Sequence, residues 1–162
     1  MQSKMESDPI IDHVIQKYYD MVYKLAYART RNQYDAEDIL QEVFLRYIRR
    51  SPEFMGEEHE KAWFLRVTIN CSKNLFASFK RSSTVTLYDH DMGITDEEKI
   101  LEEFLLKLPM KYRTVIHLFY YEDLKILDIA EILKLKESTV KIQLTRARRL
   151  LKNYMEMEVQ DV

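Results

Sequence analysis

The chain has 162 residues and a net charge of −2, with only two glycines and three prolines. So few turn-forming residues argue against a many-stranded sheet and against glycine-rich phosphate loops, so we expect an all-α fold. One cysteine excludes an internal disulfide, and the histidines lack zinc-ligand spacing, so we expect no metal or cofactor. With no signal peptide and no apolar run near the roughly 18 residues of a membrane span, we expect a cytoplasmic protein without membrane insertion.

Three helices are predicted in the first half of the chain. An Asp-Pro pair begins a helix over residues 9–31, because Pro suits the first helical position. Asp35 is predicted to cap a second helix that ends near Arg50. A loop over residues 51–56, which contains Pro and Gly, separates it from a third helix over 60–80. The side chains expected to be buried in the first helix recur at helical spacing, namely Val14, Tyr18, Val22 and Leu25.

The second half is predicted to be a separate helical unit. Residues 82–95 mix Ser, Thr, Asp and Gly, which indicates a flexible acidic linker. Thr95 and Glu98 have the spacing of a capping box, and Pro109 lies where a further helix can start. Ser138 is predicted to cap the last helix. We therefore expect two small helical domains, over residues 9–81 and 96–155, joined by this linker.

Charge is distributed unevenly along the chain. Residues 61–81 carry five basic and no acidic side chains, and residues 125–152 carry eight basic and three acidic ones, so each segment has a net charge of +5. Residues 82–103 carry one basic and seven acidic side chains, a net charge of −6. Two basic segments predict two contact sites for a polyanion. The alternative is that both are solvated helix faces.

Residues 126–152 have the layout of a helix-turn-helix, whose second helix enters the major groove of DNA. Val140, Leu144, Ala147 and Leu151 lie on one face of that second helix, which leaves its basic and amide side chains on the remaining surface. Arginine can bind guanine through two hydrogen bonds, and a helix N-terminus can accept a phosphate. The alternative is an ordinary antiparallel helix pair, which shares this apolar pattern.

Two further segments suggest binding surfaces. In residues 61–81, positive charge alternates with aromatic residues, and aromatic and amide side chains suit unstacked bases of single-stranded DNA. The alternative is that at least two of these aromatic residues belong to the core. In residues 35–46, acidic and amide side chains share one exposed face, which is either a docking face for a basic protein helix or a solvated surface.

The order of these motifs resembles the bacterial RNA polymerase sigma factors of the extracytoplasmic-function group, in the sigma-70 family. An acidic helix, a W-x-x-R-x-x-x-N helix, a linker, an L-P-x-x-Y-R motif and a helix-turn-helix ending in R-A-R follow one another over about residues 10–152. The resemblance implies that the chain binds core RNA polymerase and a two-part promoter. An anti-sigma factor is a further implied partner, and we expect a monomer when free.

The resemblance also implies roles for individual residues. The helix surface that would dock on the polymerase consists of Asp38, Gln41 and Glu42. The surface that would capture a flipped base of the −10 element consists of Phe54, Gly56, Trp63 and Asn70, with Lys73, Asn74 and Lys80 nearby. The −35 element would be contacted by Ser138, Thr139, Lys141, Ile142, Gln143, Thr145, Arg146, Arg148 and Arg149. Among these, Gln143, Arg148 and Arg149 are expected to touch phosphates or hold the fold.

Three positions depart from the family pattern. Lys134 and Ser138 stand where glycine is frequent, so we expect either a left-handed Lys134, at roughly 1–2 kcal/mol, or a turn of different shape. Ile142 stands where a polar reader is common, and its side chain suits contact with a thymine methyl.

The sequence fits two other classes of function less well. A stand-alone helix-turn-helix regulator explains residues 126–152 but not the aromatic-basic and acidic helices. An enzyme would need a site such as a metal held by Asp89-His90-Asp91, or Cys71 as a nucleophile, and no second group of ligands supports either. We therefore expect that the chain is not an enzyme.

Overall fold

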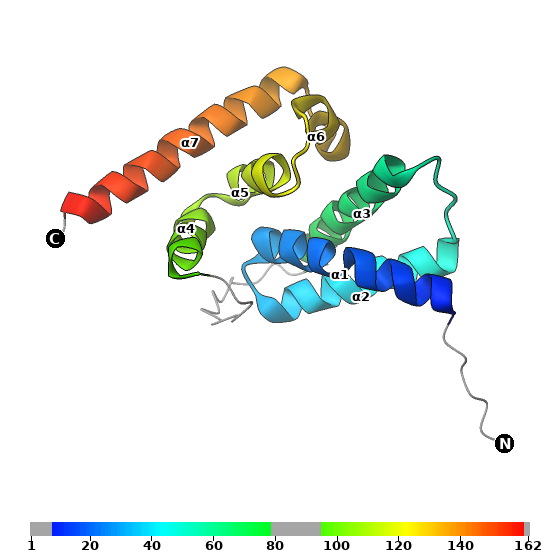
Figure 1. Cartoon of the computed structure of the whole chain (residues 1–162). Helices are drawn as coiled ribbons and strands as arrows, with labels where there is room; N and C mark the ends of the chain where they lie inside the picture. Colours follow the sequence, from blue (N-terminus) through cyan, green and yellow to red (C-terminus); the bar gives the residue numbers. More distant parts are fainter. Residues whose placement is uncertain (1–7, 79–94, 161–162) are drawn as a thin grey trace.

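The structure, a computed structural model, describes residues 8–78 and 95–160. These residues form seven α-helices and one short π-helix and contain no strand, so the all-α prediction is confirmed. The N-terminal half consists of α1 (Pro9–Thr30), α2 (Gln33–Arg50) and α3 (Glu57–Ser78). The C-terminal half consists of α4 (Asp96–Lys107), α5 (Met110–Ile116), η1 (His117–Tyr121), α6 (Ile126–Leu133) and α7 (Glu137–Gln160) (Figure 1).

The N-terminal half is built around α1, which packs against both α2 and α3. The four residues of α1 predicted as apolar and inward-facing are all buried. Phe64 of α3 is fully buried, with its ring centroid 4.4 Å from that of Tyr18 and 5.7 Å from that of Phe44. The aromatic contacts therefore join all three helices in one core.

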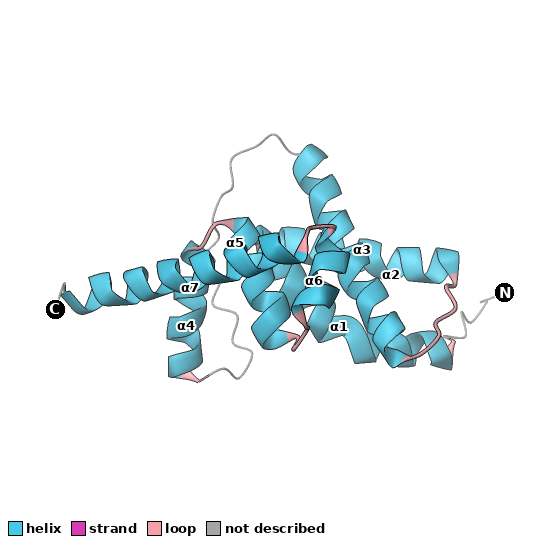
Figure 2. Cartoon of the chain, turned by 90° about the horizontal axis from the view of Figure 1, so that it is seen from above, coloured by secondary structure: helices cyan, strands magenta, loops and turns pink. Residues whose placement is uncertain are grey.

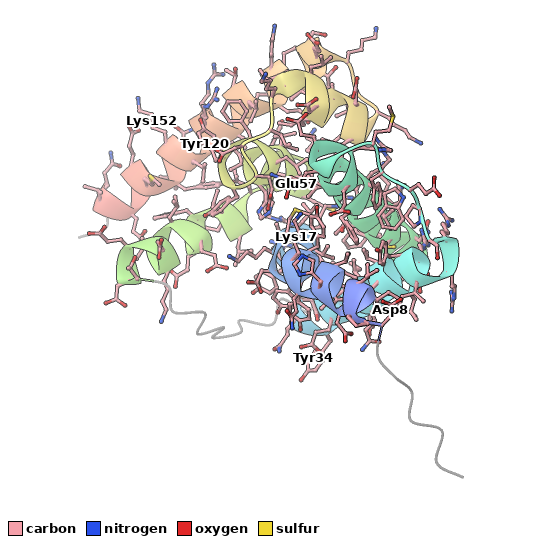
Figure 3. All side chains as sticks on the ribbon, turned by 45° about the vertical axis from the view of Figure 1, so that its right-hand side comes forward. Asp8, Lys17, Tyr34, Glu57, Tyr120 and Lys152 are labelled. Carbon is pink, nitrogen blue, oxygen red and sulfur yellow. The ribbon has the colours of Figure 1, made fainter. Side chains whose placement is uncertain are left out.

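Polar contacts also fix the start of α3 against α1. Lys17 of α1 forms an ion pair with Glu57 at 2.6 Å, and the two side chains meet in Figure 3. Tyr18 donates a hydrogen bond of 2.6 Å to Glu60, and burial raises the pKa of this tyrosine to about 12. Glu57 and Glu60 both lie in the first turn of α3, where the helix dipole favours negative charge.

Three helices end on a non-glycine residue in the left-handed region. Arg31, Ser51 and Lys134 have φ values of 52°, 42° and 56° and follow α1, α2 and α6. The left-handed Lys134 was one of the two expectations for the turn, and the structure confirms it. Leu135 N–H then bonds the Ala130 carbonyl at 2.9 Å, which closes a Schellman motif.

Several predicted helix starts are wrong. Asn32, not Asp35, caps α2, because its side chain accepts hydrogen bonds from the N–H groups of Tyr34 and Asp35. The last helix begins at Glu137, so Ser138 lies inside its first turn instead of capping it. The third helix begins at Glu57 rather than at residue 60. The predicted capping box of Thr95 and Glu98 is confirmed.

The helix-turn-helix of α6 and α7 forms the outer part of the C-terminal half. Val140, Leu144 and Ala147 are buried as predicted, and Leu151 is half-buried. The C-terminal end of α7 extends past the other helices (Figure 2). Its last turns therefore lie outside the packed body of the protein.

The two halves share a hydrophobic core, a point that the sequence left open. Leu25, Leu65 and Ile69 of the N-terminal half have no exposed surface and belong to the same buried cluster as Leu118 and Ile129 of the C-terminal half. Figure 1 shows α5 beside α1, and α6 packs on α3. The described helices therefore form a single packed body.

Candidate functional site

The acidic face of α2 points into solvent. Asp38 and Gln41 are exposed, and Glu42 is half-buried and pairs with Arg46 at 3.1 Å one turn along the helix. The pKa of Asp35 is raised, first by burial and then by the nearby charge of Asp38. The three side chains predicted to dock on the polymerase therefore lie together on one face of α2.

An aromatic cluster holds the loop between α2 and α3. The ring of Phe54 meets the edges of His59 and Trp63, with centroids 5.4 and 5.9 Å away. His59 Nδ1 accepts a hydrogen bond of 3.0 Å from the backbone N–H of Met55. This bond fixes the loop while leaving the Met55 side chain 96% exposed. Phe54 and Trp63, both predicted as base-capture residues, are thereby brought into contact.

Trp63 connects this loop to the core. Its indole lies edge-on to Tyr47 and Phe64, with centroids 6.1 and 4.9 Å away, and its side chain is half-buried. Phe64 is fully buried, whereas Trp63 is half-buried and Phe76 is 40% exposed, so among the described aromatic residues of this segment only Phe64 lies fully in the core. Gly56 is exposed, and a Cβ added there would touch nothing within 4 Å.

The remaining predicted −10 residues lie along one face of α3. Asn70 is half-buried, and Lys73 and Asn74, one turn further on, are exposed. A neighbouring face, with Leu65 and Ile69, is buried against the C-terminal half. The amide and basic side chains therefore remain accessible while the halves are in contact. Lys80 lies outside the described residues.

The exposed face of α7 carries most of the predicted −35 residues. Ser138, Ile142, Thr145 and Arg149 form a stripe at helical spacing, and all four are exposed. Ile142 keeps 50% of its surface exposed, so its side chain is accessible to a partner. Lys141 and Arg146 are also exposed and flank the stripe, whereas Thr139 and Gln143 are half-buried.

Arg148 is occupied by contacts within the protein. Its Nε donates a hydrogen bond of 2.7 Å to the Tyr120 hydroxyl, and its guanidinium lies 5.6 Å from the Phe119 ring centroid. Figure 3 labels Tyr120 beside α7. Such stacking fixes the side chain against η1, which agrees with the expectation that Arg148 holds the fold or touches a phosphate.

Sequence analysis did not identify three residues that support these surfaces. His59 and Met55 organise the loop through a local hydrogen bond, for which the only sequence signal is a histidine four residues after the exposed position. Tyr120 supports Arg148, and the aromatic run of residues 119–121 was its only signal. The Arg148–Tyr120 contact depends on tertiary structure, whereas the Met55–His59 bond is local and has only a weak sequence signal.

The structure gives no support to an enzyme among the described residues. Cys71 is buried in the N-terminal core, and burial raises the pKa of its thiol to about 11. In the described ranges, no group of three His, Cys, Asp or Glu residues is placed to hold a metal ion. The Asp89-His90-Asp91 segment lies outside these ranges. In the described ranges, no helix is long and apolar enough to cross a membrane.

Comparison with known protein families divides the chain in two. The family model described as sigma-70 region 2 matches residues 14–82, and the one described as sigma-70 region 4 matches residues 98–151. The first match covers most of α1 and all of α2 and α3, and the second runs from near the start of α4 to the middle of α7. Together the two matches span the predicted binding surfaces in the family order.

Individual curated relatives and one solved structure are similar to this chain over most of its length. RNA polymerase sigma factor SigV of Bacillus subtilis is 30% identical over 94% of this chain and 95% of its own length. The ECF RNA polymerase sigma factor SigW of the same species is 29% identical over 94% and 91%. The sigma factor RpoE of Bartonella quintana, solved in complex with the anti-sigma factor NepR, shares the fold with a TM-score of 0.74. That match covers 92% of this chain and 98% of the solved chain at 18% identity.

The environment of Cys71 predicts low thiol reactivity. Because the thiol is 4% exposed and its pKa is raised to about 11, we expect almost no reaction with a thiol reagent at pH 8 in the native protein. Unfolding in urea should expose the thiol and allow one equivalent to react within minutes. Rapid stoichiometric reaction of the folded chain would contradict the buried placement.

Proposed function

The chain belongs to the sigma-70 family, in the extracytoplasmic-function group of RNA polymerase sigma factors, and we propose that three of its surfaces divide the work of promoter recognition. As a sigma factor, it binds core RNA polymerase and directs it to promoters. We assign residues 9–81 to polymerase docking and −10 recognition, and residues 96–155 to −35 recognition. The main support for this assignment is that both family matches fall on helices with exposed polar faces.

Polymerase docking is assigned to α2. Asp38, Gln41 and Glu42 occupy adjacent turns of one helix and can meet a basic helix of the polymerase along their common face. The nearby carboxylates of Asp35 and Asp38 support this assignment, because negative charge on the docking helix speeds the encounter with a basic partner. Because Glu42 pairs with Arg46, only part of its carboxylate is available to a binding partner.

Base capture is assigned to the loop and the exposed face of α3. The edge of Trp63 and the ring of Phe54 offer apolar surface to an extruded base, and Asn70 offers an amide that can bond the base edge. Lys73 supplies positive charge near the strand backbone, with Asn74 beside it. Extruding a base costs a few kcal/mol, which stacking and hydrogen bonds in the pocket offset.

Duplex recognition is assigned to α7. Lys141, Ile142, Thr145 and Arg146 are exposed and can reach base edges when the helix enters the major groove. The first turn, with Ser138 and Thr139, can accept a backbone phosphate. Arg149 is assigned to a phosphate, and Gln143 and Arg148 to holding the helix in place, since Arg148 already bonds Tyr120.

Catalysis is assigned to the polymerase, and the chain is proposed to act as a monomer in the cytoplasm, where polymerase and DNA meet. The solved relative from Bartonella quintana is in complex with an anti-sigma factor, and we propose a partner of the same kind for this chain. A stand-alone regulator remains less favoured, because it leaves the region 2 match over residues 14–82 without a role.

Docking is tested by gel filtration with bacterial core RNA polymerase. The wild-type chain should co-elute at low micromolar concentration, and a Gln41→Ala/Glu42→Ala variant should co-elute at least several-fold less. The matched control is Gln16→Ala/Asp20→Ala, which removes an exposed amide and carboxylate from α1. Failure of the wild type to co-elute, with its helical content intact, would favour the stand-alone regulator.

Base capture is tested by Asn70→Ala. Loss of the amide should slow promoter opening by about tenfold, measured with a fluorescent base in the −10 element, because one hydrogen bond to the extruded base is worth about 1 kcal/mol or more. Binding to core polymerase should be unchanged. Asn153→Ala, at an exposed position of α7, serves as the control. Normal opening by Asn70→Ala would remove this residue from the capture site.

Sequence readout is tested by Arg146→Ala. Affinity should fall by roughly 1–3 kcal/mol for the preferred base at one −35 position, and discrimination at that position should relax. The readout is binding to a set of duplexes with single base-pair changes. Arg148→Ala is the comparison, and it should lower affinity for all duplexes alike through loss of its Tyr120 contact. A uniform loss with Arg146→Ala would make that residue a phosphate contact.

A further inference from the structure

A basic pocket lies beside the C-terminal end of α1. It has a volume of about 440 Å³, and its walls come from α1, α3, the end of α4 and the start of α5. Among the described residues, four cationic side chains and no carboxylate line it, namely Arg29, Arg31, Lys107 and Arg113. Because every charged side chain around this pocket is positive, the electrostatic potential inside it favours an anion.

Two of these four cations are buried. Arg29 of α1 and Arg113 of α5 are each 5% exposed, although arginine is almost never buried unless it is paired. In the described ranges, neither forms an ion pair with a carboxylate. Burial lowers the pKa of both to about 10, and the charges of Arg31 and Arg29 also lower that of Arg113. Both therefore stay charged at neutral pH, and an anion in the pocket offsets their mutual repulsion.

Neutral hydrogen-bond acceptors hold the two buried guanidinium groups in fixed positions. Arg29 donates through Nε to Ser72 Oγ at 2.8 Å and through Nη1 to Thr114 Oγ1 at 3.0 Å. Arg113 donates to the Ala28 carbonyl at 2.6 Å and to the Arg29 carbonyl at 3.1 Å. The two bonds of the Arg29 side chain leave its Nη2 to donate to a ligand. A guanidinium that is already fixed loses little entropy when it binds a phosphate.

The other two cations and an aromatic ring are more accessible. Arg31 is half-buried, and its Nη1 donates a hydrogen bond of 3.0 Å to the Leu106 carbonyl. Lys107 is exposed, and its Nζ lies 5.2 Å from the ring centroid of Phe104. Phe76 of α3 also lines the pocket and is 40% exposed, so its ring is available for stacking. The pocket therefore offers cationic donors and an aromatic surface together.

This combination fits a phosphorylated molecule that carries an aromatic ring. Arginine binds phosphate oxygens through two parallel hydrogen bonds, and lysine binds them as a point charge. An aromatic side chain stacks on any nucleobase, because every base has a π face. Small-molecule sites occupy roughly 300–1,000 Å³, and the pocket volume of about 440 Å³ falls in that range. Nucleotides combine phosphate charge with a base that can stack.

We propose that this pocket is a nucleotide-binding site, in which Arg29, Arg31 and Lys107 bind the phosphate groups and the base stacks on Phe76. Arg113 adds positive charge and fixes the end of α1 through its bonds to backbone carbonyls. None of these residues belongs to the three surfaces assigned to polymerase and promoter, so the site does not depend on that assignment. A nucleotide bound there contacts α1, α3 and α4 at once and stabilises the folded chain.

Isothermal titration calorimetry of the full chain with ATP, tripolyphosphate and adenosine tests the site. ATP should bind about tenfold more tightly than either of the other two, because it alone combines phosphate charge with a base. The Tm should also rise with the ATP concentration. Equal affinity for ATP and tripolyphosphate would overturn recognition of the base, and absence of ATP binding would overturn the site. A single-stranded oligonucleotide that competes with ATP and binds more tightly would make the pocket a nucleic-acid contact instead.

The role of the cations is tested at accessible positions, where substitution leaves the core intact. Lys107→Gln should weaken ATP and tripolyphosphate binding alike, by roughly threefold to tenfold. Its matched control is Lys111→Gln, because Lys111 is also exposed, and its Nζ lies 5.0 Å from the Tyr112 ring, but it does not line the pocket. Arg31→Gln should act like Lys107→Gln, with Arg50→Gln at the end of α2 as its control. If both pocket variants bind ATP as their controls do, the site is wrong.

Phe76→Leu tests the stacking of the base. The variant keeps an apolar side chain and removes the ring, so the affinity for ATP should fall about tenfold while that for tripolyphosphate is unchanged. Phe76→Tyr keeps the ring and should bind ATP as the wild type does. Wild-type ATP affinity in Phe76→Leu would overturn the stacking and with it the nucleotide assignment. All of these titrations use the chain alone, so they decide the site whether or not the chain binds polymerase.

Discussion

The position of α1 is the constraint on which the rest of the structure depends. One side of this helix, with Val14, Tyr18 and Val22, forms the core with α2 and α3. Its C-terminal part supplies Leu25 to the core that contains the helix-turn-helix, and its last carbonyls accept hydrogen bonds from Arg113. A single helix therefore orients both halves, and each surface assigned to DNA or polymerase lies on a helix that packs directly or indirectly on α1.

Local signals in the sequence predicted the helices well and their starts less well. The apolar spacing of α1 and α7 and the capping box at Thr95 follow from forces within a few residues, whereas the left-handed Lys134 was one of two turn shapes suggested by the family resemblance. Asn32 and Asp35 both have side chains that can cap a helix, and periodicity does not distinguish which of them lies one residue outside the first turn. The prediction that Ser138 caps the last helix is wrong for a similar reason, since Glu137 already has helical geometry.

Most of the contacts that sequence analysis missed connect distant segments, and the local Met55–His59 bond is the exception. Periodicity predicts that arginine lies on a solvated face, so the burial of Arg29 and Arg113 follows only once α5 packs on the end of α1. The same limit applies to Tyr120, which meets Arg148 from a different helix. The exposure of the predicted site residues was easier to predict. Most of them are polar side chains on the side of a helix opposite a buried stripe, and that placement follows from helical spacing alone. Their roles come from the family resemblance and await the variants.

The contact between the two halves combines apolar burial with directed hydrogen bonds. Leu25, Leu65 and Ile69 have no exposed surface and belong to the same cluster as Leu118 and Ile129, so the burial of apolar area favours the packed arrangement. Arg113 donates hydrogen bonds to the Ala28 and Arg29 carbonyls at the end of α1, and such bonds define an orientation because their strength depends on geometry. Apolar burial therefore holds the halves together, and the guanidinium of Arg113 fixes how α5 lies on α1.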